Sequence, residues 1–215
     1  MRLAVLISGA GSNMVAIAEA CAAGRIPAQI ALVLSDRADA GGIARARELG
    51  LPVAVVDRRR FRRDGRLDRV AFEAALEEPL RQHQAEVLIL AGFMTVLSAG
   101  FVERHAGRIL NIHPSLLPGY PGLDTHARVL AAGESQHGAT VHFVTAELDG
   151  GPLILQAAVP ILAGDDVASL SARVHAQEHT IYPMTISWLA SRRLEWNAGS
   201  PTLDGALLRG PVQHV

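Results

Sequence analysis

Two patterns of apolar residues alternate along this 215-residue chain. Short apolar runs, rich in leucine and β-branched residues and bounded by turn residues, are typical of strands buried on both faces. Between them lie stretches with the 3.6-residue period of helices. The expected strands are 2–8, 28–34, 52–57, 86–91 and 108–112, and the expected helices are 12–24, 41–49, 66–83, 124–133 and 166–189. This alternation predicts an α/β fold, a doubly wound, mostly parallel sheet with helices on both faces.

The pattern changes after residue 136. The segment "GATVHFVTAELDGGPLILQAAVP" predicts two longer strands joined through "LDGG", which has the composition of a hairpin turn. Beyond Ser191, "RLEW" and "TLDGALL" suggest a small hairpin. The chain shows no repeat, no low-complexity segment and no linker. We therefore expect one domain over 1–215, with halves of about 1–100 and 101–190 and a tail over 191–215.

Composition narrows the class of protein. Apolar residues make up 49% of the chain and charged residues 19%, which argues against disorder. The single cysteine, Cys21, excludes an internal disulfide and fits a reducing compartment. Because it follows Ile17 at helical spacing, we expect a packed core thiol. The first apolar run is too short to span a membrane. The expectation is a cytoplasmic protein without a membrane partner.

Charge gives little support for a nucleic-acid partner. The formal net charge is -1, so no global basic field surrounds the protein. The stretch "DRRRFRRDGR" over 57–66 is rich in arginine, but Phe61 is its one aromatic residue, and Asp57 and Asp64 interrupt the positive charge. We interpret it as a solvated loop and expect no nucleic-acid binding.

The stretch "NIHPSLLPGYPG" follows the last strand of the parallel set. Residues two apart on a strand point the same way, so Asn111 and His113 share one side and Ile112 takes the other. Pro114 has no amide hydrogen and should end the strand. A carboxamide and an imidazole are therefore expected side by side at the carboxyl end of a strand, followed by a stiff loop.

A glycine loop follows the first strand in "VLISGAGSNM". Gly9 and Gly11, with Ser12 and Asn13 opening a helix, would aim free backbone amides at an anion such as a phosphate. A tight turn without a ligand is the alternative. The dinucleotide fingerprint is incomplete, because Met14 stands at its third glycine position. Asp36, after the second strand, would be the ribose-binding acid if the chain were a dehydrogenase.

Histidines and one aspartate complete the candidate chemistry. Of the nine histidines, four fall in one region, but none of these four are at i, i+4 spacing and no H-E-x-x-H motif appears, so we expect no metal site: His113, His126, His137 and His142. His142 in "TVHFV" is either a core histidine or a partner of a functional group. Asp149 in "ELDGGP" is either a turn former or a catalytic carboxylate that meets His113. In the second case Asn111, His113 and Asp149 would suit direct attack of an amine on an acyl carbon, since no activated serine or cysteine appears.

Four motifs in this order, "SGAGSN", "LAGFMTVLS", "NIHPSLLPGYPG" and "HFVTAELDGGPLILQ", resemble those of the phosphoribosylglycinamide formyltransferases, folate-dependent enzymes of purine synthesis. The resemblance covers nearly the whole chain. "YPGL", "QEHTIYP" and the short length separate it from methionyl-tRNA formyltransferases and formyltetrahydrofolate hydrolases, which carry additional domains.

The resemblance implies formyl transfer from 10-formyltetrahydrofolate, as co-substrate, to the amine of phosphoribosylglycinamide, by a monomer or homodimer. Asn111, His113 and Asp149 match the catalytic positions. The remaining matches are Gly11, Ser12, Asn13 and Glu178 for phosphate and ribose, and Arg69, Phe93, Met94, Thr95, Val96, Leu97, Ala146, Glu147 and Leu148, with Asn111 and Asp149, for folate. Arg69 would lie near the glutamate tail, and 93–97 would line the pterin pocket.

Three positions depart from the pattern of the family. Thr95 stands where many relatives have arginine, although the backbone there is expected to carry the contact. Asp124 replaces a frequent histidine, and His175 lies where relatives often place glutamine or lysine. Two other functions compete with formyl transfer: a nicotinamide dehydrogenase built on the glycine loop and Asp36, and a non-catalytic protein that binds a phosphorylated metabolite. The latter would have no use for Asn111 and His113 together.

Overall fold

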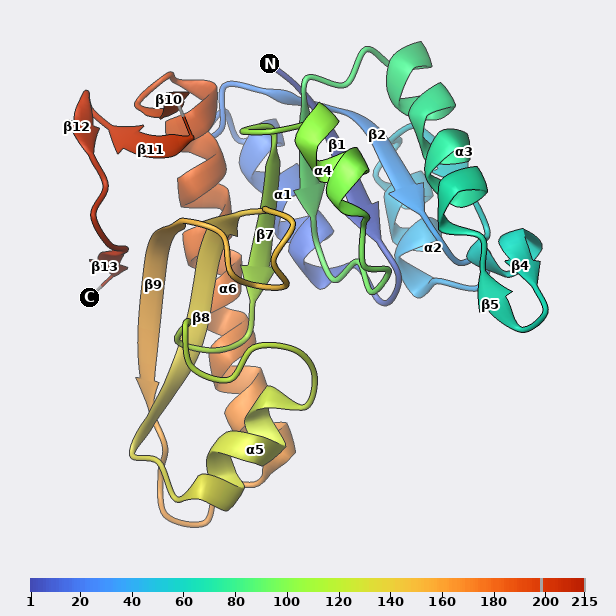
Figure 1. Ribbon diagram of the computed structural model, residues 1–215. Coiled ribbons are helices and arrows are strands. Elements are labelled where there is room, and N and C mark those ends of the chain that lie inside the picture. The colour runs from blue at the N-terminus through green and yellow to red at the C-terminus, as the bar shows by residue number, and fades with distance from the viewer. Residues whose placement is uncertain (198, 215) are drawn as a thin grey trace. The chain divides into compact units, whose positions relative to one another are not determined.

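The computed structural model describes residues 1–197 and 199–214 (Figure 1). They form two compact units, Met1–Leu110 and Asn111–Val215. The boundary falls within strand β7 (Ile109–His113), whose last three residues begin the second unit. The expected halves of a single domain, divided near residue 100, stay a prediction.

The first unit is built on four parallel strands. Their order is β6-β1-β2-β3, with β1 (Arg2–Ile7), β2 (Gln29–Ser35), β3 (Val53–Val55) and β6 (Val87–Leu90). Leu3 to Ile7 are completely buried, as expected of a central strand covered on both faces. The strands expected in this part of the chain are confirmed.

Three helices connect these strands, and a fourth follows β6: α1 (Ser12–Ala22), α2 (Gly41–Glu48), α3 (Arg69–Gln82) and then α4 (Ala99–Arg104). The start of α1 lies close to the start of α2. A Cβ on Gly11 would lie 2.9 Å from the Cα of Gly42, and Gly11 has a φ of 75°. Glycine is therefore required at position 11 by the fold itself, before any ligand is considered.

The expected start of α3 at residue 66 is wrong. Residues 62–67 form a small hairpin of β4 (Arg62–Arg63) and β5 (Arg66–Leu67), after the short 3₁₀ helix η1 (Arg58–Phe61). Asp64 and Gly65 both have positive φ, which is the conformation of a two-residue hairpin turn. Helix α3 begins only after Asp68, whose carboxylate accepts a hydrogen bond from the amide of Ala71.

The second unit contains the two longer strands that the sequence predicts. β8 (Gln136–Phe143) and β9 (Leu153–Pro160) are antiparallel, and the short strand β13 (Val212–His214) runs parallel to β9. The connection between β8 and β9 spans 144–152, so it is a longer loop and not a tight hairpin turn.

The other elements of the second unit are α5 (Thr125–Ala132), α6 (Val167–Ala190) and a small sheet of β10 (Leu194–Asn197), β11 (Ser200–Leu203) and β12 (Ala206–Leu207). Asp166 caps α6, because its carboxylate accepts a hydrogen bond from the amide of Ser169. The small sheet includes the hairpin expected beyond Ser191 and adds a third strand to it.

Two further expectations from the sequence concern the burial of Cys21 and the presence of membrane-spanning helices. Cys21 on α1 is half-buried and not part of the core, so the expectation of a packed core thiol is wrong. This partial burial raises the pKa of its thiol. Within the described residues, no helix is both long enough and apolar enough to cross a membrane.

Candidate active site

Strand β7 brings Asn111 and His113 to its carboxyl end, as predicted. The strand ends at His113, immediately before Pro114. His113 is buried and Asn111 is half-buried. The alternation of a strand puts both side chains on one side, so the imidazole and the carboxamide can act on the same group.

A proline-rich loop, 114–124, follows β7 and holds two of the candidate side chains in place. Its backbone reaches two candidate side chains. The carbonyl oxygen of Tyr120 lies 2.9 Å from Nε2 of His113, and the amide of Gly122 donates to Oδ2 of Asp149 at 2.9 Å. The loop thus holds the imidazole and the carboxylate through backbone groups, and does not depend on its side chains.

Asp149 meets His113 directly. Oδ2 of Asp149 lies 3.4 Å from Nδ1 of His113, and both side chains are more than nine-tenths buried. Because a carbonyl oxygen can only accept, Nε2 of His113 carries a proton that it donates to Tyr120. Nδ1 is then the nitrogen that takes or gives the second proton, and it faces a carboxylate. Asp149 also has a φ of 52°, so it is a turn residue as well as a partner of His113.

His142 is a buried partner of the site. Its Nδ1 lies 2.9 Å from the carbonyl oxygen of Phe143, so Nδ1 carries a proton. Nε2 lies 3.2 Å from Nδ2 of Asn111 and 3.9 Å from Oδ1 of Asp149. Burial lowers the pKa of His142, against smaller raising effects of Phe143 and Asp149. The neutral ring therefore accepts from Asn111 through Nε2.

This contact orients the carboxamide of Asn111. A neutral Nε2 can only accept, so the amide nitrogen of Asn111 must face His142. One of its two N–H bonds points at the ring, and the other is left to donate elsewhere. The register of β8 and β9 shifts between Val141 and His142, and such a bulge re-aims a side chain. Of the two roles that the sequence left open for His142, a partner of a functional group is the one that this geometry favours.

The group of Asn111, His113, His142 and Asp149 combines one amide donor, the histidine that orients it, one proton carrier and one carboxylate. An amide N–H can stabilise an oxyanion, and an imidazole paired with a carboxylate can move a proton near neutral pH. This arrangement suits the attack of a nucleophile on a carbonyl carbon.

Comparisons with known proteins identify the family. The model of the formyl transferase family matches residues 1–186 of the chain. This chain belongs to the formyl transferase family. The phosphoribosylglycinamide formyltransferase of Escherichia coli (strain K12) is 48% identical over 208 residues, which cover 97% of this chain and 96% of the relative. The enzyme of that name from Haemophilus influenzae is 44% identical over 207 residues, which cover 96% of this chain and 95% of the relative.

Solved structures agree with this family and with its fold. The phosphoribosylglycinamide formyltransferase of Coxiella burnetii has a TM-score of 0.90 and 42% identity, and the match covers 98% of both chains. The glycinamide ribonucleotide transformylase 1 of Symbiobacterium toebii has a TM-score of 0.88 and 45% identity, over 94% of this chain and 93% of that one. The predicted α/β fold with a mostly parallel sheet is confirmed.

The residues matched to the phosphate loop of formyl transferases lie at the start of α1. Gly11 is the residue before the helix, and Ser12 and Asn13 are its first two residues. The first amides of a helix have no acceptor within the helix, and they lie at the positive end of its dipole. Gly11 is buried and Ser12 is half-buried. Their assignment to phosphate stays a prediction.

The residues matched to folate binding differ in exposure. Over 93–97, Met94 and Val96 are exposed, Thr95 and Leu97 are buried, and Phe93 is half-buried. In the loop before Asp149, the exposed residues are Ala146, Glu147 and Leu148. Arg69, the first residue of α3, is exposed, whereas Glu178 on α6 is buried. The role of each in substrate binding stays a prediction.

Two of the departures from the family pattern lie in the second unit. Asp124, with a φ of 56°, is the residue before α5, and its side chain makes no capping hydrogen bond there. His175 is exposed on α6, and its ring centre lies 6.5 Å from that of His126. His126 is in turn paired with His137, Nδ1 to Nε2 at 3.0 Å. Within 1–197 and 199–214, no three His, Cys, Asp or Glu side chains are arranged to hold a metal ion.

The pair of His126 and His137 predicts a loss of stability in acid. Burial, followed by the charge of nearby histidines, lowers the pKa of His137 from 6.5 to about 4. The unfolded chain therefore binds this proton from about pH 6.5 downward, but the folded chain binds it only near pH 4. The contribution of neutral His137 to the free energy of unfolding should be fully present above pH 6.5. It should be lost as the pH falls to 4, by about 3 kcal/mol at most.

Denaturant unfolding at neutral pH and near pH 4 checks this expectation. His137→Gln removes the titrating group, so its stability should depend less on pH than that of the unsubstituted protein. Identical pH dependence in the two proteins would show that His137 does not titrate between folding states in this way.

Proposed function

We propose that this chain transfers the formyl group of 10-formyltetrahydrofolate to the amine of 5'-phosphoribosylglycinamide, a step of de novo purine (IMP) biosynthesis. The observation that carries the proposal is the contact of His113 with Asp149, 3.4 Å between Nδ1 and Oδ2, beside the amide of Asn111. The 48% identity to a phosphoribosylglycinamide formyltransferase over nearly the full length of both chains supports the choice of substrates.

The reaction proceeds by direct attack. The amine nitrogen forms a bond to the formyl carbon, and the carbonyl electrons move onto its oxygen to give a tetrahedral oxyanion. The amine then loses a proton, the bond from the formyl carbon to N10 of the folate breaks, and N10 receives a proton. The carbonyl forms again in the product, and no covalent intermediate with the enzyme is needed.

Each residue of the group has one task in this reaction. Asn111 donates its second N–H to the oxyanion, and His142 holds the carboxamide in the required orientation. His113, in its cationic form, stabilises the oxyanion. Asp149 pairs with that cation and organises the proton transfer, through a water molecule. Both ring nitrogens of His113 face protein groups, so the bond to Tyr120 must open before Nε2 can reach an oxyanion.

The proposed binding residues are those that match the family. Gly11, Ser12 and Asn13 would hold the phosphate through the amides that begin α1, and Glu178 would lie near the ribose. The folate would contact Arg69, 93–97 and 146–149. We propose a cytoplasmic enzyme without a metal, acting as a monomer or a homodimer on small-molecule substrates.

The dehydrogenase alternative conflicts with the position of Asp36. A ribose-binding acid must be accessible to the cofactor. The Asp36 side chain is completely buried, and its Oδ2 is bonded to Thr95 and Arg58. Met14, at the third position of the fingerprint, is also completely buried. Asp36 is therefore unavailable as the acidic partner of a nicotinamide cofactor.

The test of this function is a tetrahydrofolate-release assay with 10-formyltetrahydrofolate. We expect release to require the ribonucleotide amine, because the sequence shows no motif of an activated serine or cysteine nucleophile. Phosphoribosylglycinamide should support turnover. Equal release with water alone would assign the chain to the hydrolases, and no release under either condition would favour a non-catalytic binding protein.

A further inference from the structure

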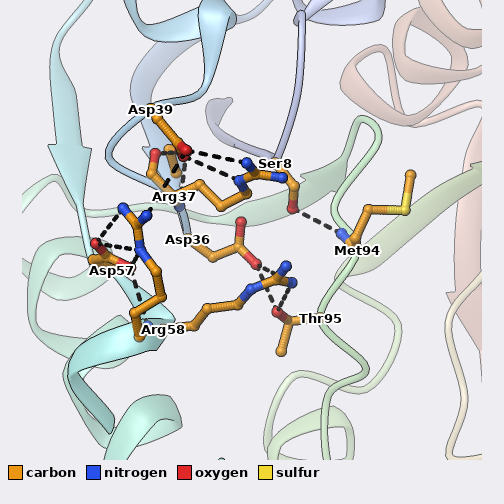
Figure 2. Close-up of polar contacts among 10 residues, drawn as sticks. Ser8, Asp36, Arg37, Asp39, Asp57, Arg58, Met94 and Thr95 are labelled. Atoms are coloured by element: carbon orange, nitrogen blue, oxygen red, sulfur yellow. Dashed lines mark hydrogen bonds and ion pairs between the residues drawn. The ribbon is translucent and has the colours of Figure 1, made fainter. Parts of the chain in front are cut away.

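Asp36 lies buried at the end of β2, and hydrogen bonds reach only one of its two carboxylate oxygens (Figure 2). Its Oδ2 accepts a hydrogen bond from Oγ1 of Thr95 at 2.6 Å and one from Nη1 of Arg58 at 3.2 Å. The other oxygen, Oδ1, has no hydrogen-bond partner among the described residues. A buried carboxylate is costly unless it is paired, so the stability of this charge depends on Thr95 and Arg58.

A third hydrogen bond, from Arg58 to Thr95, closes a triangle of Asp36, Thr95 and Arg58. Nη1 of Arg58 donates to Oγ1 of Thr95 at 3.1 Å as well as to Asp36. Each pair within Asp36, Thr95 and Arg58 is therefore in hydrogen-bond contact, as Figure 2 shows. The Arg58 side chain is 30% exposed, whereas the other two residues are buried. The hydroxyl of Thr95 is neutral, so Arg58 alone in this triangle supplies a positive charge.

The triangle anchors the loop 92–98, which connects β6 to α4. Next to Thr95, the amide of Met94 donates to the buried hydroxyl of Ser8 at 2.8 Å. At the end of the loop, the amide and hydroxyl of Ser98 both donate to the buried carboxylate of Glu73. Groups from the ends of β1 and β2, from η1 and from α3 therefore hold this loop along its length.

The anchored loop presents two apolar side chains to solvent. Met94 is 60% exposed and Val96 is 51% exposed, while Thr95 and Leu97 between and after them point inward and are buried. The hydrogen bonds of the inward side chain at position 95 thus determine where its two exposed neighbours lie. The flat face of a ring such as the pterin of a folate can pack on apolar side chains of this kind.

We propose that Asp36, Thr95 and Arg58 position the folate-binding loop 92–98, with Arg58 supplying the positive charge that pairs with the buried Asp36. The inference rests on the proposed function. It assigns to Arg58, at the start of the arginine-rich stretch, a role that differs from that of a solvated loop residue. Asp36, which would be the acid of a dehydrogenase, becomes the buried anion that holds the loop.

Steady-state kinetics of Arg58→Ala and Asp36→Asn test the role of the triangle. Each variant should raise the KM for 10-formyltetrahydrofolate roughly tenfold, the scale of one hydrogen bond to a charged group, with a smaller change in kcat. The KM for the ribonucleotide should stay within a few-fold. Arg59→Ala is the matched control, because Arg59 pairs with Asp57 and Asp39 and should leave all three constants unchanged.

Moving the guanidinium from position 58 to position 95 makes the test sharper. In the background of Arg58→Ala, Thr95→Arg brings a guanidinium back to Asp36 from the loop itself, and it should restore most of the folate KM. Thr95→Ala in the same background should restore nothing. Thr95→Val alone keeps the shape and the ion pair of Asp36 with Arg58, so it should fold even if Asp36→Asn does not, and should raise the folate KM several-fold.

Three results would overturn the inference: an unchanged folate KM in Arg58→Ala and Thr95→Val, equal effects on both substrates and on kcat, or equal rescue by Thr95→Arg and Thr95→Ala. A merely structural role would lower the melting temperature without this split between substrates. If the unsubstituted protein showed no formyl transfer, the proposed function would fail first. Normal transfer with a wild-type folate KM in the variants would reject only the positioning role.

Discussion

Asp149→Asn should lower turnover by a factor of roughly 10²–10⁴, the range of general acid–base catalysis. Oδ2 of Asp149 faces Nδ1 of His113 at 3.4 Å and accepts the amide of Gly122 at 2.9 Å. An asparagine oxygen in the place of Oδ2 can still accept from Gly122, but it offers Nδ1 of His113 no negative charge. The cationic ring that stabilises the oxyanion would lose the charge that pairs with it. Asparagine also tolerates the φ of 52°, so the fold should survive.

The measurement combines kcat with a melting temperature for each variant. Asp64→Asn is a matched control, since Asp64 also has a positive φ, of 50°, but is exposed in the hairpin of β4 and β5. It should leave both quantities unchanged. A folded Asp149→Asn protein with near wild-type turnover would make Asp149 a turn residue alone.

Asn111→Leu should lower kcat by roughly 10²–10³, the loss seen when one oxyanion donor is removed. Leucine keeps the approximate size of the side chain but removes the N–H that would stabilise the oxyanion. It also leaves Nε2 of His142 without the donor that it has at 3.2 Å. The KM for either substrate should change less than kcat, because the lost bond forms in the transition state.

His142→Leu separates orientation from donation. The carboxamide of Asn111 remains, but nothing fixes which way it faces, so the loss in kcat should be smaller, roughly tenfold. The double variant should lose little more than Asn111→Leu alone, because the two residues act as a unit. Additive losses would show that His142 acts independently of Asn111.

The elements that the sequence predicted well depend on local signals. The parallel strands are continuous apolar runs, and the end of β7 at His113 follows from Pro114, which cannot donate to a sheet. The error at α3 has a local cause as well. The second strand of the small hairpin, Arg66–Leu67, lies directly before the helix, and the expected helix included it.

Contacts between distant segments could not be predicted in this way. The apposition of His113 and Asp149 depends on the loop 114–124, whose backbone groups at Tyr120 and Gly122 meet both side chains. No residue type in that loop indicates these bonds, because any residue can supply a carbonyl, and any residue but proline an amide hydrogen. Arg58 is a similar case. In the sequence it is one of several arginines, and only the position of Asp36 distinguishes it.

The sequence by itself determined the fold class, the strand that carries Asn111 and His113, and the family. Periodicity and proline act over a few residues, and the order of motifs can be recognised along the chain without knowledge of its contacts. The tertiary structure alone decided that Asp149 faces His113, that His142 orients Asn111, and that Arg58 neutralises Asp36. These contacts join residues far apart in the chain. They form where burial leaves a charge or a hydrogen-bonding group with only a few possible partners, and packing selects which of those partners is within reach.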